Sequence, residues 1–121
     1  MLSRKAVFAS IVAVSLSIAS LVALADDMGT QLKGNDIIKA LADHEIYAVG
    51  PDGKPWTGIY KSDGTAKWGN GSTGTWRVDG DKFCDHPAGD KEYCRTVYKV
   101  GNNKYQLMRP DGTKGALLTT E

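Results

Sequence analysis

Two cysteines and two histidines are the residues whose types could carry chemistry in this chain, and the cysteines have the more informative spacing. Cys84 and Cys94 are separated by nine residues, whereas redox pairs favour two intervening residues. If successive strands of one hairpin carry them, the two side chains lie opposite each other and can be bridged. The spacing therefore predicts a structural disulfide between Cys84 and Cys94, with a redox or metal-binding pair as the alternative.

The histidines do not complete a metal site or a catalytic triad. A zinc site needs three or four ligands, and the chain has only His44 and His86. His86 lies near Cys84, but we expect that cysteine to be oxidised. A Ser-His-acid triad needs a positioned serine, and beyond residue 25 only Ser62 and Ser72 occur, both in predicted turns. We therefore predict no metal, no cofactor and no catalytic residue.

A glycine-rich run at residues 69–74 matches the pattern G-x-G-x-x-G of dinucleotide-binding loops. That chemistry requires a strand before the run and a helix after it. The residues that follow, Thr75–Val78, are instead typical of a strand. We therefore interpret the run as a hairpin loop.

Aromatic residues are the first candidates for a binding surface. In the predicted strand at 56–61, Trp56, Gly58 and Tyr60 share one face, and in the strand at 73–78, Trp76 and Val78 share another. The two faces could be core, or they could line a cavity or groove to which a glycine admits a ligand.

Basic residues are the second candidates. Alternation along the predicted strand at 92–100 places Cys94 on one face and Arg95 and Lys99 on the other, which we expect to be the outer face. Together with Arg77, these side chains could form a weak patch for an anionic partner, or they could be ordinary solubilising charges.

The N-terminus has the three parts of a secretory signal peptide. Arg4 and Lys5 are followed by an uncharged apolar stretch at 6–19, and the small residues Ala23 and Ala25 stand where a signal peptidase needs them. This order predicts removal of residues 1–25 and a periplasmic or secreted protein without stable membrane insertion. The alternative is an uncleaved membrane anchor, because about 20 apolar residues can span a bilayer.

The remaining residues, 26–121, suit one domain. We expect a flexible lead-in at 26–33 and a single β-rich domain at 34–121. Near its start, Ile37, Ile38 and Leu41 fall on one helical face. With Asn35 as N-cap, they predict one short helix at 35–42.

From His44 onward, short runs rich in aromatic and β-branched residues alternate with turn residues, and Asp-Gly occurs four times. Asp-Gly suits tight hairpin turns, so the pattern predicts consecutive antiparallel strands. We expect a mainly β fold: an antiparallel meander that forms a small barrel or half-barrel, with one short N-terminal helix after the signal peptide.

The motifs of this meander resemble a family of small secreted proteobacterial domains of unknown function, with a DGT…GTW…C…C pattern. The resemblance spans about Ile37 to Gly112 and rests on Asp63-Gly64-Thr65, on the run 73–80, and on the segments around the two cysteines. The pattern is also similar to lipocalin-like β-barrels. It implies a lipocalin-like or half-barrel fold, and it carries over no catalytic residue.

These observations together predict an exported, non-catalytic binding domain. Its partner would be a small amphipathic ligand or another envelope protein, while the lack of any block of basic residues argues against nucleic acid. The alternatives are a secreted hydrolase, using carboxylates from the Asp-Gly turns, or a protein inhibitor that presents the Cys84–Cys94 loop. The candidate binding residues are Trp56, Tyr60, Trp76, Arg77 and Arg95.

Overall fold

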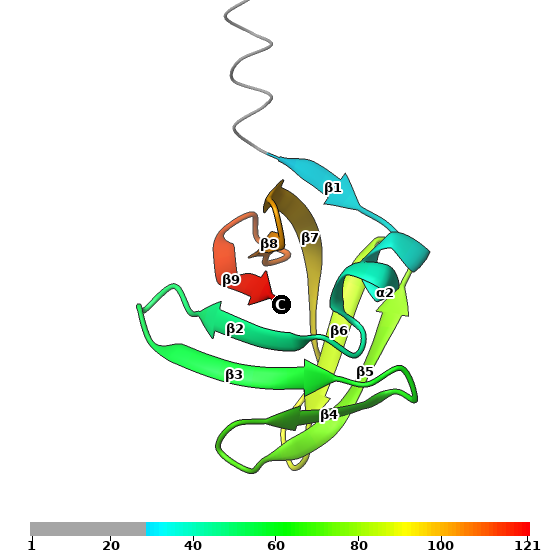
Figure 1. Ribbon diagram of the computed structural model, residues 1–121, viewed down its shortest axis with the longest axis vertical. Coiled ribbons are helices and arrows are strands. Elements are labelled where there is room, and N and C mark those ends of the chain that lie inside the picture. Colours follow the sequence, from blue (N-terminus) through cyan, green and yellow to red (C-terminus); the bar gives the residue numbers. More distant parts are fainter. Residues whose placement is uncertain (1–28) are drawn as a thin grey trace, which may run out of the picture.

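The computed structural model describes residues 29–121, so the predicted signal peptide lies outside the described residues. Within these residues, one short helix precedes eight of the nine strands (Figure 1). The elements are β1 (Thr30–Leu32), α2 (Asn35–Leu41), β2 (Glu45–Val49), β3 (Pro55–Tyr60), β4 (Thr65–Trp68), β5 (Thr73–Asp79), β6 (Lys82–Pro87), β7 (Tyr93–Gly101), β8 (Lys104–Met108) and β9 (Lys114–Thr120).

Strands β2 to β9 form a closed, eight-stranded, antiparallel barrel. Each strand pairs with the next one in sequence, and β9 pairs with β2 to close the ring. The prediction of a mainly β meander with one short helix is therefore confirmed, and the sheet closes fully. Among residues 29–121, no helix is long and apolar enough to cross a membrane.

Four of the hairpin turns use the same local chemistry. In each, a side-chain oxygen of Asp52, Asp63, Asn70 or Asp111 accepts the backbone N–H two residues later, at 2.9–3.0 Å. The glycine that follows has a φ of 80–90°, a conformation that costs glycine little. The glycine-rich run at 69–74 contains one of these turns, which confirms its interpretation as a hairpin loop.

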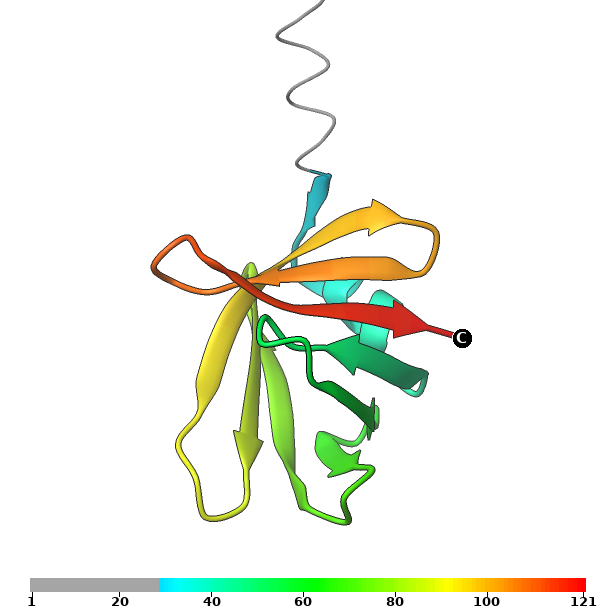
Figure 2. The ribbon, with the colours of Figure 1, turned by 90° about the vertical axis from the view of Figure 1, so that its left-hand side faces the viewer.

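The two ends of the barrel differ (Figures 1 and 2). Helix α2 closes one end, where Ile37 and Leu41 are fully buried and the Gly34 N–H donates to Gly80 of the β5–β6 turn. Because connections alternate between the ends of an up-and-down barrel, the β2–β3, β4–β5, β6–β7 and β8–β9 loops all lie at the other end. We call that end the mouth.

The predicted start of the helix needs correction. The N-cap position is Gly34 rather than Asn35, which lies in the first turn, and no side chain caps the helix. Ile38 is 38% exposed, because a helix this short turns only one narrow stripe toward the barrel. The helix ends at Leu41, one residue before the predicted end.

The described part of the segment expected to be a loose lead-in is also ordered. Residues Thr30–Leu32 form β1, which pairs antiparallel with Val97–Lys99 of β7. Strand β6 pairs only with residues 93–96 of β7, so β1 continues the ladder along the same strand. This pairing supplies partners to backbone groups that would otherwise be unpaired.

The barrel interior is filled by aromatic and aliphatic side chains. The Tyr60 ring packs edge-on against Phe83 and Trp76, with ring centroids 4.9 and 5.8 Å apart. Val97 is fully buried, whereas Val100 is 42% exposed. The predicted facing of β7 was therefore wrong: residues 95 and 97 point inward, and the face of Cys94 points outward.

Candidate functional site

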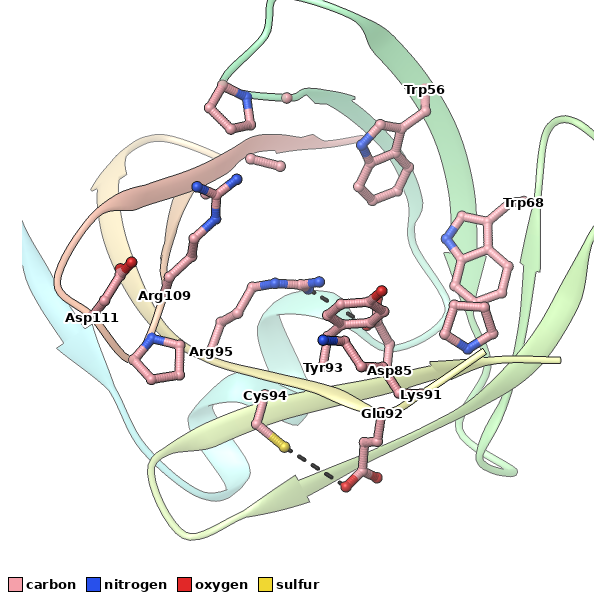
Figure 3. A pocket seen from close by; sticks show the side chains of 16 residues that line it. Trp56, Trp68, Asp85, Lys91, Glu92, Tyr93, Cys94, Arg95, Arg109 and Asp111 are labelled. Atoms are coloured by element: carbon pink, nitrogen blue, oxygen red, sulfur yellow. Dashed lines mark hydrogen bonds and ion pairs between the residues drawn. The ribbon is translucent and has the colours of Figure 1, made fainter. Parts of the chain in front are cut away.

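A cleft of about 720 Å³ opens at the mouth of the barrel. Its rim comes from the β2–β3, β6–β7 and β8–β9 loops, and its walls come from inward-facing residues of the strands below (Figure 3). A second hollow of about 610 Å³ lies beside it, reaches Tyr47 on the outer face of β2, and shares Trp56 and Trp68 with the cleft.

Three half-buried aromatic side chains line the cleft: Trp56 of β3, Trp68 of β4 and Tyr93 of β7. Gly58 pairs with Trp68 across β3 and β4. A Cβ at Gly58 would lie 3.0 Å from Cδ1 of the Trp68 indole. The glycine therefore makes room for the wall of the cleft itself, and not directly for a ligand.

A buried carboxylate forms the polar floor of the cleft. Asp85 is only 6% exposed. Its Oδ2 accepts a hydrogen bond from the Tyr60 hydroxyl at 3.1 Å, and its Oδ1 lies 3.5 Å from Nη1 of Arg95. Burial, and then the negative charge of Asp85, raise the pKa of Tyr60 far above its usual value. Tyr60 consequently stays protonated and serves as a permanent donor.

Basic side chains surround Tyr93. The Arg95 guanidinium lies 5.6 Å from the centroid of the Tyr93 ring, and Lys91 Nζ of the β6–β7 loop lies 5.2 Å from it. Arg109, where β8 enters its loop, completes the basic lining. Figure 3 shows the Arg95 side chain extending across the floor toward Tyr93 and Asp85, with both tryptophans on the far side.

Arg77 does not belong to the cleft. It pairs with Cys84 across β5 and β6, whereas Arg95 pairs with Phe83 across β6 and β7. Neighbouring positions of a strand face opposite sides of the sheet, so the two arginines point away from each other. On the outer face, Arg77 donates to both carboxylate oxygens of Glu92 at 2.9 Å. The predicted patch of Arg77, Arg95 and Lys99 is therefore not formed.

The other predicted site residues are divided between core and cleft. Trp56 and Arg95 both line the cleft, while Tyr60 lies beneath it, bonded to Asp85 and packed edge-on against Trp68. Trp76 is 9% exposed and belongs to the core, where its Nε1 donates to the Lys61 carbonyl at 2.6 Å.

Sequence reasoning missed five of the lining residues on which the site depends. Trp68 alternates with buried Ala66 on its strand, and that signal could have found it. The remaining four depend on pairing register or on barrel closure, which the sequence does not display. They are Asp85, Lys91, Tyr93 and Arg109.

The predicted disulfide is confirmed. Cys84 and Cys94 lie directly opposite each other on β6 and β7 and are bonded. Within residues 29–121, the one cluster of potential metal ligands consists of these two sulfurs and Glu92. Both sulfurs are used in the disulfide, so neither is available as a thiolate ligand, and the bond links β6 to β7. Such bonds persist in oxidising compartments, which agrees with an exported protein.

Comparisons with known proteins do not indicate a function, so the function is argued from the geometry of the cleft. No family model matches the chain, and no significantly similar curated protein or solved structure was found. The resemblance to the DGT…GTW…C…C family accordingly stays a prediction.

Proposed function

We propose that this protein is an exported, non-catalytic binding domain that holds a small amphipathic ligand in the cleft at the barrel mouth. The observation that carries the proposal is the convergence of Trp56, Trp68 and Tyr93 with Arg95 and Arg109 around one cleft. Small-molecule sites are typically concave, have volumes of about 300–1,000 Å³, and combine apolar walls with a few placed polar groups.

The composition of the lining favours binding over catalysis. Among the described residues that line the cleft there is no serine, threonine or histidine, and Cys94 is oxidised. Asp85 is held by Tyr60 and Arg95. A hydrolase would need a nucleophile or an activated water within reach of a base. The carboxylates that could serve here, Asp85, Glu92 and Asp111, already accept hydrogen bonds from within the chain.

Tryptophan emission provides the test, because two of the three tryptophans line the cleft and Trp76 lies in the core. An aromatic probe, either neutral N-phenyl-1-naphthylamine or its amphipathic sulfonated analogue 8-anilinonaphthalene-1-sulfonate, should quench the emission with saturation. The variant Trp56→Leu should weaken binding, whereas Tyr47→Leu, an aromatic control on the outer face, should not.

Each other outcome has a defined meaning. Loss of binding in Tyr47→Leu as well would move the site to the neighbouring hollow, which both residues line. Failure of both probes to bind, or equal binding by wild type and Trp56→Leu, would refute the cleft as the site.

A protein partner is the second candidate, and it is favoured by one observation. Tyr47, Val49 and Leu117 are exposed apolar side chains on the outer face of β2 and β9, and Val49 is paired directly with Leu117. Co-purification of an envelope protein that is lost in Val49→Ser, with probe binding unchanged, would support this second role.

Export to the periplasm or outside the cell is part of the proposal, and the disulfide supports it. The intact mass of the protein from the envelope or secreted fraction should correspond to a chain that starts at Asp26. A mass that retains residues 1–25 would contradict cleavage and favour the membrane anchor.

A further inference from the structure

The carboxylates that line the cleft are already used within the chain. Asp85 is held by Tyr60 and Arg95. Glu92 is bound on the outer face by Arg77, whose hydrogen bonds lower the pKa of that carboxylate. Asp111 accepts the Thr113 N–H and hydroxyl in its own turn. Asp85 and Glu92 are thus paired with arginines, and Asp111 is the one lining carboxylate without an ion pair among residues 29–121.

The basic groups of the cleft, by contrast, have spare donors. Arg109 is exposed on the rim, and within residues 29–121 its side chain forms no ion pair. Over the same residues, Nζ of Lys91 lies over the Tyr93 ring and forms no ion pair, while the Lys91 backbone N–H donates to Asp90. Arg95 has a single bond to Asp85, through Nη1, which leaves most of its five N–H donors available.

The packing below the cleft limits the shape of a ligand. Tyr60, Phe83 and Trp76 fill the barrel beneath the floor, with ring centroids 4.9–6.0 Å apart. A long acyl chain therefore has no room to run down the barrel axis. The apolar surface that a ligand can reach is the flat indole wall of Trp56 and Trp68.

We propose that the ligand is a compact aromatic anion. Its acidic group would lie between Arg95, Arg109 and Lys91, and its ring would lie against Trp56 and Trp68. This inference rests on the proposed function and adds the charge and the shape of the ligand. The chemical class is an aryl carboxylate, sulfonate or phosphate.

The test uses two dyes that share one ring system and differ in charge. The anion 8-anilinonaphthalene-1-sulfonate should bind at least about threefold more tightly than neutral N-phenyl-1-naphthylamine at low salt. The variant Arg109→Gln should weaken the anion about threefold to fivefold, the size of one exposed ion pair, and leave the neutral dye unchanged. High salt should reduce the difference between the dyes, because it screens exposed charges.

Controls separate the charge effect from misfolding and from net charge. Lys39→Gln removes an exposed positive charge from α2 at the closed end and should bind both dyes as wild type does. Equal thermal unfolding of Arg109→Gln and wild type would show that the rim substitution leaves the fold intact. A displacement experiment tests the shape of the ligand. The compact anion 1-naphthoate should displace bound 8-anilinonaphthalene-1-sulfonate at lower concentration than the long-chain anion dodecanoate does.

The outcomes distinguish the two proposals. Equal affinities for both dyes, with no effect of Arg109→Gln, would overturn the inference about charge and leave the binding function standing. Stronger displacement by dodecanoate would overturn the inference about shape. Failure of both dyes to bind the wild-type protein would overturn the binding function and the inference together.

Discussion

The ion pair at the floor of the cleft can be tested by a double-mutant cycle. Arg95→Met removes the positive charge and leaves Asp85 buried, while Asp85→Asn removes the negative charge and keeps an oxygen to accept from Tyr60. The double variant removes both charges. We expect Arg95→Met alone to destabilise the barrel more than the double variant does.

The expected size follows from distance and burial. At 3.5 Å, two unit charges attract by about 5 kcal/mol at an effective dielectric constant of about 20, before the cost of desolvation. Leaving one partner of a buried pair uncompensated costs about 3–5 kcal/mol. The Arg95 side chain is 21% exposed at the cleft, so we expect the lower end of that range.

Asp85→Asn should cost less, about 1 kcal/mol, because Arg95 can turn toward water in the cleft. The double variant should cost about 1–1.5 kcal/mol, which gives a coupling of about 2–3 kcal/mol between the two sites. Urea unfolding, followed by tryptophan emission, measures all three free energies. For a domain of this size Arg95→Met should also lower Tm by at least about 12 °C.

Two results would refute this reasoning. If Arg95→Met lowered the free energy of unfolding by less than about 1 kcal/mol, the pair would be behaving like a solvent-exposed salt bridge. If the losses of the single variants simply added, the two charges would not be coupled, and the 3.5 Å contact would carry no energy.

The remaining predictions concern the disulfide, the sheet and the turns. Replacing Cys84 and Cys94 together by Ala should cost about 2–3 kcal/mol in chemical denaturation, because the bond closes a short loop. Gly74→Ala should cost about 1–3 kcal/mol, since its Cβ would collide with the backbone of β6, whereas Gly101→Ala, with no contact under 3.7 Å, should be nearly neutral. The hydrogen bonds from Thr113 lower the pKa of Asp111 below 3.8. The ionised carboxylate therefore stabilises the folded state above pH 3.8, and this stabilisation is lost as the pH falls through the pKa of the folded protein. Asp111→Asn should flatten that part of a curve of unfolding free energy against pH.

Local chemistry in the sequence was sufficient to predict most of the architecture. Asx-Gly pairs determine turns within a few residues of themselves, as the two hydrogen bonds that Thr65 donates to Asp63 show. The turns then require consecutive antiparallel strands, and the spacing of Cys84 and Cys94 places them across one hairpin. These features depend on neighbours in sequence, which is why they could be predicted without the fold.

Local sequence did not determine which face of β7 points into the barrel. Alternation shows that Arg95 and Val97 share a face, but both faces of β7 carry apolar residues. The choice depends on Val97 facing Leu107 across β8 and on Arg95 facing Phe83 across β6. Those contacts exist only after the strands have paired, so sequence reasoning placed Arg95 on the wrong face.

The order of strands β2 to β9, the turns and the disulfide could all be predicted from the sequence, because each depends on residues close together in the chain. Closure of the sheet between β9 and β2 joins strands that are about 70 residues apart, and it became visible only in the folded structure. Closure brings the loops that carry Arg109 and Lys91 to one mouth, together with Trp56 from a distant strand. The cleft arises from this long-range pairing, so the set of residues that line it could not be predicted from the sequence.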